Sequence, residues 1–173
     1  MVQNVGLKAA NIYSLVGLGT QYVVVLEEVD GPRLLPIWIG PAEGNAIALF
    51  LSQTPFPRPV THDLLLNILK AFQIKVSRVI ITELKESTFH ASIFVELNGA
   101  RQEIDARPSD SIAIALRSGA PLFITDSVFE KCETLLKPIS KTEVDDFKKK
   151  LADLKPHDIY KDIQPPGPED PGK

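Results

Sequence analysis

The first third of the chain carries apolar residues in the pattern of β-strands. Residues 4–16 and 20–29 are rich in Val, Leu, Ile and Tyr and are separated by a segment with two glycines, which indicates a β-hairpin. Residues 22–26, Tyr-Val-Val-Val-Leu, contain no charged position, so we expect this strand to be buried on both faces. A third apolar run over residues 34–39 follows an Asp-Gly-Pro turn. The pattern therefore predicts an antiparallel meander at the start of the chain.

Helical spacing replaces this pattern in the next segment. Residues 42–51 are small and apolar around most of the helical circumference, which predicts a buried helix. Three prolines make residues 54–60 a loop that cannot be helical. Thr61 is the expected N-cap of a second helix. Apolar residues continue this helix at helical spacing: Leu64, Leu65, Ile68, Leu69 and Phe72.

A second group of strands follows. Residues 74–84 contain a run of β-branched residues, and residues 88–97 alternate between apolar and polar positions, as half-buried strands do. Asn98-Gly99 is a strong signal for a hairpin turn. It leads into a predicted strand over residues 100–106.

The last part of the chain favours helices. Ser109 is the expected N-cap of an apolar helix that Gly119 ends. A short strand over 121–125 and a helix over 127–136 are predicted next. A highly charged helix then carries a narrow apolar stripe, which predicts a surface helix packed along one edge. The stripe consists of Val144, Phe147, Leu151 and Leu154.

The order of these elements predicts the fold class. Helices come between antiparallel hairpins and do not alternate strictly with strands, which indicates an α+β fold with a mixed, largely antiparallel sheet covered by helices. We expect a single compact domain over residues 1–137 and a charged helical extension over 138–163. Residues 164–173 contain four prolines and are expected to be a disordered tail.

The charge balance limits the partners of the protein. The 173 residues include 19 Lys and Arg against 22 Asp and Glu, a formal charge of −3. Because nucleic-acid binding depends on basic side chains that neutralise phosphates, this balance disfavours a broad binding face and permits a small local site.

The cysteine content and the hydropathy indicate a location. Cys132 is the only cysteine in the sequence, so no intramolecular disulfide can form, and a reducing compartment such as the cytoplasm is expected. The longest stretch without charge, residues 9–26, is interrupted by Asn, Ser, Thr, Gln and Gly, so we expect no membrane span.

Two short motifs combine an Arg-Pro pair with a hydroxyl side chain and an acid in the first turn of a helix. They are Arg58-Pro-Val-Thr-His-Asp63 and Arg107-Pro-Ser-Asp110. A helix N-terminus presents unpaired backbone N–H groups and partial positive charge, and an adjacent arginine offers bidentate contacts to phosphate. The resulting hypothesis is that the two motifs converge on a phosphodiester through four substrate-binding side chains: Arg58, Thr61, Arg107 and Ser109.

Acidic side chains near these motifs offer the hard oxygen ligands that Mg²⁺ or Mn²⁺ prefers. A bound metal can activate water for phosphodiester cleavage, and His62 is the available general acid or base. The candidate metal ligands are Glu43, Asp63, Asp105 and Asp110. The candidate catalytic residues are His62, Asp63, Asp105 and Asp110.

A purely structural interpretation explains the same residues. The acids can stabilise helix N-termini, the arginines can pair with them, and the hydroxyl groups can act as ordinary caps. Ion pairs at helix starts are common, so the residue types alone leave both interpretations open.

Three motifs in sequence order carry a family resemblance. Leu35-Pro-Ile-Trp-Ile-Gly-Pro-Ala-Glu-Gly44, Arg58-Pro-Val-Thr-His-Asp63 and Asp105-Ala-Arg-Pro-Ser-Asp110 together resemble the bifunctional nuclease domain family over about residues 5–137. The resemblance implies an intracellular α+β domain that forms a homo-oligomer, with a dimer favoured. It also implies a non-specific RNase and DNase activity assisted by a divalent metal, which is attributed chiefly through plant relatives.

Two functional hypotheses follow. The first is a divalent-metal-dependent nuclease that hydrolyses phosphodiester bonds in RNA and DNA with little sequence specificity, with RNA or single-stranded DNA as the expected substrate. The alternative is a non-enzymatic binding module that recognises a phosphorylated metabolite or a partner protein through the two Arg-Pro helix N-termini. The nuclease hypothesis requires at least two of the four acids to lie within reach of one cation, whereas the binding hypothesis requires only that the two arginines converge.

Overall fold

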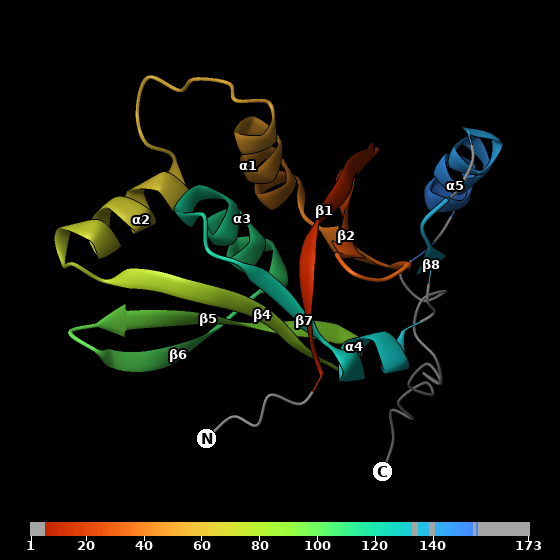
Figure 1. Ribbon diagram of the computed structural model, residues 1–173. Helices are drawn as coiled ribbons and strands as arrows, with labels where there is room; N and C mark the ends of the chain where they lie inside the picture. The colour runs from red at the N-terminus through yellow and green to blue at the C-terminus, as the bar shows by residue number, and fades with distance from the viewer. Residues whose placement is uncertain (1–5, 133–134, 139–140, 154, 156–173) are drawn as a thin grey trace, which may run out of the picture.

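Hydrogen bonds between strands join distant parts of the chain into one sheet. The computed structural model describes residues 6–132, 135–138, 141–153 and 155. Within them, eight strands pair in the order β6-β5-β4-β7-β1-β2-β3-β8 (Figure 1). The strands are β1 Leu7–Leu18, β2 Gln21–Glu28, β3 Arg33–Ile39, β4 Lys75–Lys85, β5 Thr88–Leu97, β6 Ala100–Ala106, β7 Leu122–Thr125 and β8 Leu135–Leu136.

Two antiparallel units make up this sheet. β1, β2 and β3 form the predicted meander, and β4, β5 and β6 form the second unit. β7 lies between the two units, antiparallel to β1 and parallel to β4. The fold is therefore α+β, with a mixed and largely antiparallel sheet in one compact domain, which confirms the predicted fold class.

The turn between β5 and β6 shows why the local sequence pattern could predict these two strands. Asn98 and Gly99 both have positive φ, 52° and 80°, as a two-residue hairpin turn of this kind requires. Asn tolerates this conformation better than most residues, and Gly adopts it without strain. The predicted hairpin is confirmed.

Three helices cover one face of the sheet (Figure 1). They are α1 Pro41–Leu51, α2 Thr61–Ala71 and α3 Pro108–Ser118. α3 contacts α1, α2, β4 and β5, and its residues 112–115 are buried, so it forms the centre of the main core. None of the described helices combines the length and the apolar content that crossing a membrane requires.

Residues 23–26 of β2 are buried on both faces of the sheet, as their apolar pattern predicts. Because side chains alternate along a strand, Val24 and Leu26 contribute to the main core, while Val23 and Val25 belong to a second, smaller core. The second core therefore lies on the face opposite α1, α2 and α3.

α5 (Lys141–Asp153) packs against the second core along one edge. Leu151 is buried there and Phe147 is partly buried, which confirms two positions of the predicted apolar stripe. The side chain of Val144, residue Leu154 and the predicted tail over 164–173 lie outside the described residues.

The predicted helix over residues 127–136 is wrong beyond Lys131. α4 comprises Asp126–Lys131, and Cys132 is already extended, with φ −108° and ψ 153°. β8 then pairs with the edge of β3. An open strand edge offers unpaired N–H and C=O groups to any segment that reaches it, and this non-local partner overrides the helical spacing of the apolar residues.

α1 and α2 are less buried than their apolar composition predicts. In α1, Gly44 and Ile47 are the buried residues; in α2, the buried residue is Leu66. The helices form a single layer on the sheet, so no described element covers their outer sides. The apolar side chains exposed there are Phe50, Leu51, Leu64, Leu65, Ile68 and Phe72.

Both predicted N-caps are wrong by one or two residues. Val60 is the N-cap of α2 and Arg107 is the N-cap of α3, so Thr61 and Ser109 lie inside the first helical turns. In α2, the carboxylate of Asp63 accepts a hydrogen bond from the backbone N–H of Val60 at 3.2 Å. In α3, a proline occupies the first helical position, where its fixed φ starts the helix.

Candidate active site

Three helices begin around one cavity. The cavity has a volume of about 320 Å³ and is lined by residues from α1, from the start of α2 and from the start of α3. Each helix carries an acid in its first turn, namely Glu43, Asp63 and Asp110, where the helix dipole stabilises negative charge. The positive ends of three helix dipoles therefore surround the cavity.

The guanidinium group of Arg107 connects two of these acids. Its Nη1 lies 2.9 Å from Oε1 of Glu43, and its Nε lies 2.8 Å from Oδ2 of Asp110. Hydrogen bonds and charge, from Asp110 above all and then from Glu43, raise the pKa of Arg107. Its side chain is 65% exposed, and three of the five guanidinium N–H donors are not used by these two contacts. Arg107 is therefore fixed in place and still able to bind an anion.

His62 extends this chain of contacts. Its Nε2 lies 3.1 Å from Oδ1 of Asp110. Burial by itself raises the pKa of Asp110, but the hydrogen bonds from Arg107 and His62 act in the opposite direction, and the net effect holds that pKa below its ordinary value. An ionised Asp110 favours the tautomer in which His62 donates from Nε2, which leaves a lone pair on Nδ1. Such a histidine can accept a proton.

Asp63 belongs to a different cluster. Its Oδ1 accepts a hydrogen bond from Nε of Arg117 at 2.7 Å. Arg117, whose side chain is 5% exposed, also donates to the backbone oxygens of Ala46 at 2.8 Å and Ala113 at 3.1 Å. Arg117 therefore connects the last turn of α3 to the middle of α1 and to the first turn of α2.

The two Arg-Pro motifs are not equivalent in three dimensions. Arg107 is the N-cap of α3, which begins at the proline of its motif, whereas Arg58 precedes the N-cap of α2 by two positions, because α2 begins two residues after its proline. Arg58 accordingly lines a neighbouring cavity of about 560 Å³. Among the other predicted substrate-binding residues, Thr61 lines the cavity with Arg107, and Ser109 is buried beside a hollow that Glu43 and Arg107 also line.

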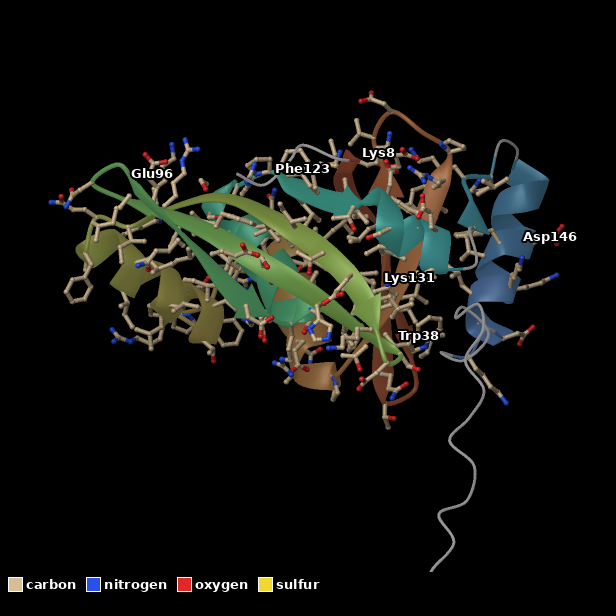
Figure 2. The ribbon with its side chains drawn as sticks, turned by 90° about the horizontal axis from the view of Figure 1, so that it is seen from below. Lys8, Trp38, Glu96, Phe123, Lys131 and Asp146 are labelled. Carbon is tan, nitrogen blue, oxygen red and sulfur yellow. The ribbon has the colours of Figure 1, made fainter. Side chains whose placement is uncertain are left out.

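Asp105 lies away from the other candidates. It pairs with Ser92 in the register of β6 and β5, and it lines a hollow with His90 and two glutamates. Figure 2 shows the molecule from below, with Glu96 of β5 and Phe123 of β7 labelled. Ser92 lines the same hollow and alternates along β5 with the core residues Ala91 and Ile93, so the hollow lies on the face of the sheet opposite the main core. The structure thus brings together Glu43, His62, Arg107 and Asp110 and leaves Asp105 and Arg58 outside.

The predicted metal ligands do not fit a metal ion as they are placed. Glu43 and Asp110 are engaged by Arg107, and Asp63 by Arg117. Within the described part of the chain, no group of three or more His, Cys, Asp or Glu side chains is arranged to hold a metal. The geometry therefore favours a site organised around a guanidinium group.

Sequence reasoning missed two residues that position this cluster. The sequence motifs do not include Arg117. An arginine at the end of an otherwise apolar helix nevertheless indicates a buried partner. Gly44 allows α1 to pack directly on Tyr22, since a Cβ at this glycine would lie 2.2 Å from the Tyr22 ring. The Tyr22 hydroxyl also donates to Asn45 Oδ1 at 2.7 Å. These contacts set the position of Glu43.

The fold and the Arg107 cluster define an α+β domain with a cavity at converging helix N-termini. Residues 24–137 match the bifunctional nuclease domain family, and the chain belongs to this family. It is similar to two proteins of Mycobacterium tuberculosis, "Uncharacterized protein Rv1829" of strain ATCC 25618 / H37Rv and "Uncharacterized protein MT1877" of strain CDC 1551 / Oshkosh. Each is 38% identical over 148 residues, which cover 80% of this chain and 88% of the relative.

Proposed function

We propose that the protein is a nuclease that hydrolyses phosphodiester bonds in RNA and single-stranded DNA at the cavity beside Arg107. The family supports a nuclease-like function. The observation that carries the proposal is the connected chain Glu43–Arg107–Asp110–His62 at the start of three helices. It combines a guanidinium group that can bind an anion, Arg107, with an imidazole that can transfer a proton, His62, in one cavity.

In this proposal, Arg107 binds the phosphate. The guanidinium N–H groups that Glu43 and Asp110 do not use contact the non-bridging oxygens, and the N-terminus of α3 adds partial positive charge. Glu43 holds the guanidinium plane in position, so little side-chain freedom is lost on binding.

His62 moves the proton. Nδ1 accepts a proton from a water molecule as its oxygen forms a bond to phosphorus, and the P–O bond to the leaving nucleoside breaks. The same proton then passes from His62 to the leaving oxygen, so one water is consumed and one alcohol and one phosphate monoester are produced. Asp110 holds the ring and stabilises its charged form during the transfer.

Dependence on Mg²⁺ or Mn²⁺ is a separate proposal. It requires Glu43 and Asp110 to exchange Arg107 for a cation, since both are engaged by that arginine. Parallel reactions with Mg²⁺, with Mn²⁺ and with EDTA measure it directly. Equal rates in all three would exclude a metal requirement.

The nuclease proposal is tested by cleavage of single-stranded RNA and DNA by the purified protein. His62→Gln should lower kcat/KM at least about 100-fold, the scale of general acid–base catalysis, and Arg107→Gln should lower it as well. Arg101→Gln, an exposed arginine on β6, is the control and should leave cleavage unchanged. Cleavage by His62→Gln at the parent rate would contradict the proposal and assign the activity to a contaminant or to another site.

One observation favours a binding module as a second candidate, in a form that uses Arg107 without Arg58, because the two arginines line different cavities. The acids beside Arg107 are already paired to it, as a resting anion-binding site requires. In that case the parent protein binds a phosphorylated ligand through Arg107, and His62→Gln binds it equally well, while neither cleaves nucleic acid.

We also propose that the protein is a cytoplasmic homodimer formed through the outer face of α2. Leu64, Leu65, Ile68 and Phe72 lie along this face and are between 43% and 69% exposed. They leave on the order of 400 Å² of apolar surface in water, within the range of functional patches. Thr61 continues the same face at helical spacing, so none of the residues along this face is charged. A second copy suits such a face, because a two-fold axis packs the same face of both copies together, and charges of one sign on it would repel each other.

Mass measurement by light scattering during size-exclusion chromatography tests this dimer. The parent should have about twice the chain mass of 19.0 kDa, and Ile68→Asp should be a monomer because the charge is placed in the apolar contact. Ile104→Asp, at a comparably exposed position on β6, should leave the mass unchanged. A monomeric parent would refute the dimer.

A further inference from the structure

A second cavity lies beside the one that contains Arg107. It has a volume of about 560 Å³ and is formed by the end of α1, by α2 and by the loop that joins them, which arches between the two helices (Figure 1). Leu49 and Val60 line both cavities. The two cavities therefore share a wall, and an extended ligand that enters one can reach the other.

The charges in this cavity favour an anionic ligand. Arg58, Asp63 and Arg117 line it, for a net formal charge of +1. Asp63 and Arg117 neutralise each other, whereas Arg58 has no hydrogen bond or ion pair with any described residue. The remaining arginines of the chain all have an acid or an aromatic ring as a partner: Arg33, Arg78, Arg101, Arg107 and Arg117. Arg58 is thus available for a ligand phosphate in addition to Arg107, and among the described residues no acid competes for it.

Two aromatic rings stand at the same cavity. Phe56 is 58% exposed and Phe50 is 39% exposed, although Phe is a residue that burial favours. The guanidinium of Arg117 lies 5.5 Å from the centre of the Phe50 ring and is itself held by three hydrogen bonds. Phe50 is therefore a fixed surface on which a planar group can stack, and Phe56 provides a second ring.

Amide side chains complete the lining. Gln53 and Asn67 both face this cavity, and neither side chain has a hydrogen-bond partner among the described residues. An amide offers a donor and an acceptor close together, which matches the edge of a nucleobase. The combination of stacking surface, amides and a cationic side chain is that of a nucleotide-binding site.

We infer that this cavity binds one nucleobase of a single-stranded nucleic acid, with the adjoining backbone phosphate on Arg58. This inference rests on the proposed nuclease function, because it places the base next to the phosphodiester that Arg107 holds. A base in a duplex is stacked and paired and cannot enter the cavity without unstacking, so the site selects single strands. Stacking is available to every base, which is consistent with little sequence specificity.

Binding of a fluorescein-labelled deoxythymidine oligonucleotide with phosphorothioate linkages, which keep the backbone charge and resist cleavage, is followed by fluorescence anisotropy in EDTA and tests the inference. Phe56→Ala and Arg58→Gln should each raise Kd about tenfold, the scale of one lost base stack or phosphate contact. The matched controls are Ile104→Ala and Arg101→Gln, which are exposed residues of β6 that line neither cavity. They should bind as the parent does, and a duplex of the same length should bind more weakly than the single strand.

A kinetic comparison separates this inference from the proposed nuclease function. For a parent that cleaves, Phe56→Ala should lose more activity on the same oligonucleotide with ordinary phosphodiester linkages than on bis(p-nitrophenyl) phosphate, which has no base. A parent that binds the oligonucleotide through Phe56 and Arg58 but cleaves no substrate would refute the nuclease function and support the base site. Parent-like Kd values for both Phe56→Ala and Arg58→Gln, or no binding of the oligonucleotide by the parent, would refute the base site.

Discussion

Replacement of Gly44 by alanine tests how closely α1 must approach the sheet. Alanine in the interior of a helix is about 1 kcal/mol more favourable than glycine, so helix propensity alone predicts a more stable protein. The structure predicts the opposite sign. A Cβ at position 44 would lie 2.2 Å from Cδ2, 2.3 Å from Cγ and 2.7 Å from Cβ of Tyr22.

The size of the effect follows from these distances. Non-bonded carbon atoms need about 3.5 Å, so α1 and Tyr22 must separate by about 1.3 Å. The nearest atoms belong to the root of the Tyr22 side chain and cannot swing away as the end of a long side chain can. Overpacking of this kind costs about 2 kcal/mol, and loss of the Tyr22–Asn45 hydrogen bond adds about 1 kcal/mol. After the gain in propensity, we expect Gly44→Ala to lower the free energy of unfolding by about 2 kcal/mol.

Urea denaturation at constant pH measures this difference, and the melting temperature should fall by about 4–8 °C for a chain of this length. Gly17→Ala is the matched control. Its Cβ would meet the same tyrosine ring at 3.6 Å, an ordinary contact, so the change in stability should be small. A Gly44→Ala protein as stable as the parent would refute the claim that the approach of α1 to Tyr22 is limiting.

Three further predictions concern charge and backbone conformation. The pKa of Asp110 is lowered in the folded protein, so its contribution to stability is present above the ordinary value of 3.8 and is lost as the pH falls through the folded-state pKa. When the free energy of unfolding is measured at decreasing pH, Asp110→Asn should lose less stability than the parent. Parallel curves for the two proteins would contradict this. Arg117→Met removes a buried guanidinium with three hydrogen bonds and should lower the free energy of unfolding by about 3 kcal/mol in urea, whereas Arg101→Met should change it little. Gln73 follows α2 with φ 58°, so Gln73→Gly should raise the melting temperature through relief of about 1 kcal/mol of strain, and a lower melting temperature would refute this account.

The strands could be predicted because their signals are local. Alternation over 88–97 and the Asn98-Gly99 turn lie within a few residues of the hydrogen bonds they determine. β8 could not be predicted, because its partner β3 is about a hundred residues earlier in the chain. The spacing of the apolar residues over 127–136 is compatible with a helix, and only the open edge of β3 decides against it.

Helical periodicity indicated α2 but not which of its faces is buried. Leu64, Leu65, Ile68 and Phe72 form the strongest apolar stripe in the sequence of this helix, yet Leu66 contacts the core. Periodicity shows that an apolar face exists; it does not show whether the same chain covers that face.

The candidate site was predictable in part for a similar reason. The sequence identified Glu43, His62, Arg107 and Asp110, which all lie in the first turns of helices or at an N-cap. Asp105 was grouped with them because it is close in sequence, but it lies on a strand whose side chains alternate between faces. Arg117 acts through Asp63, which is 54 positions away, a pairing that a single sequence does not reveal.

The position of β7 has a consequence for how the protein is made. β7 is hydrogen-bonded to β1 on one side and to β4 on the other, so the two antiparallel units have no shared ladder until residues 122–125 are available. During synthesis, which proceeds at about 5–20 residues per second, β1 and β4 both present an open edge while the later part of the chain is still being added. The nascent chain therefore passes through a period in which two strand edges can pair with another chain, and closure of the sheet by β7 ends it.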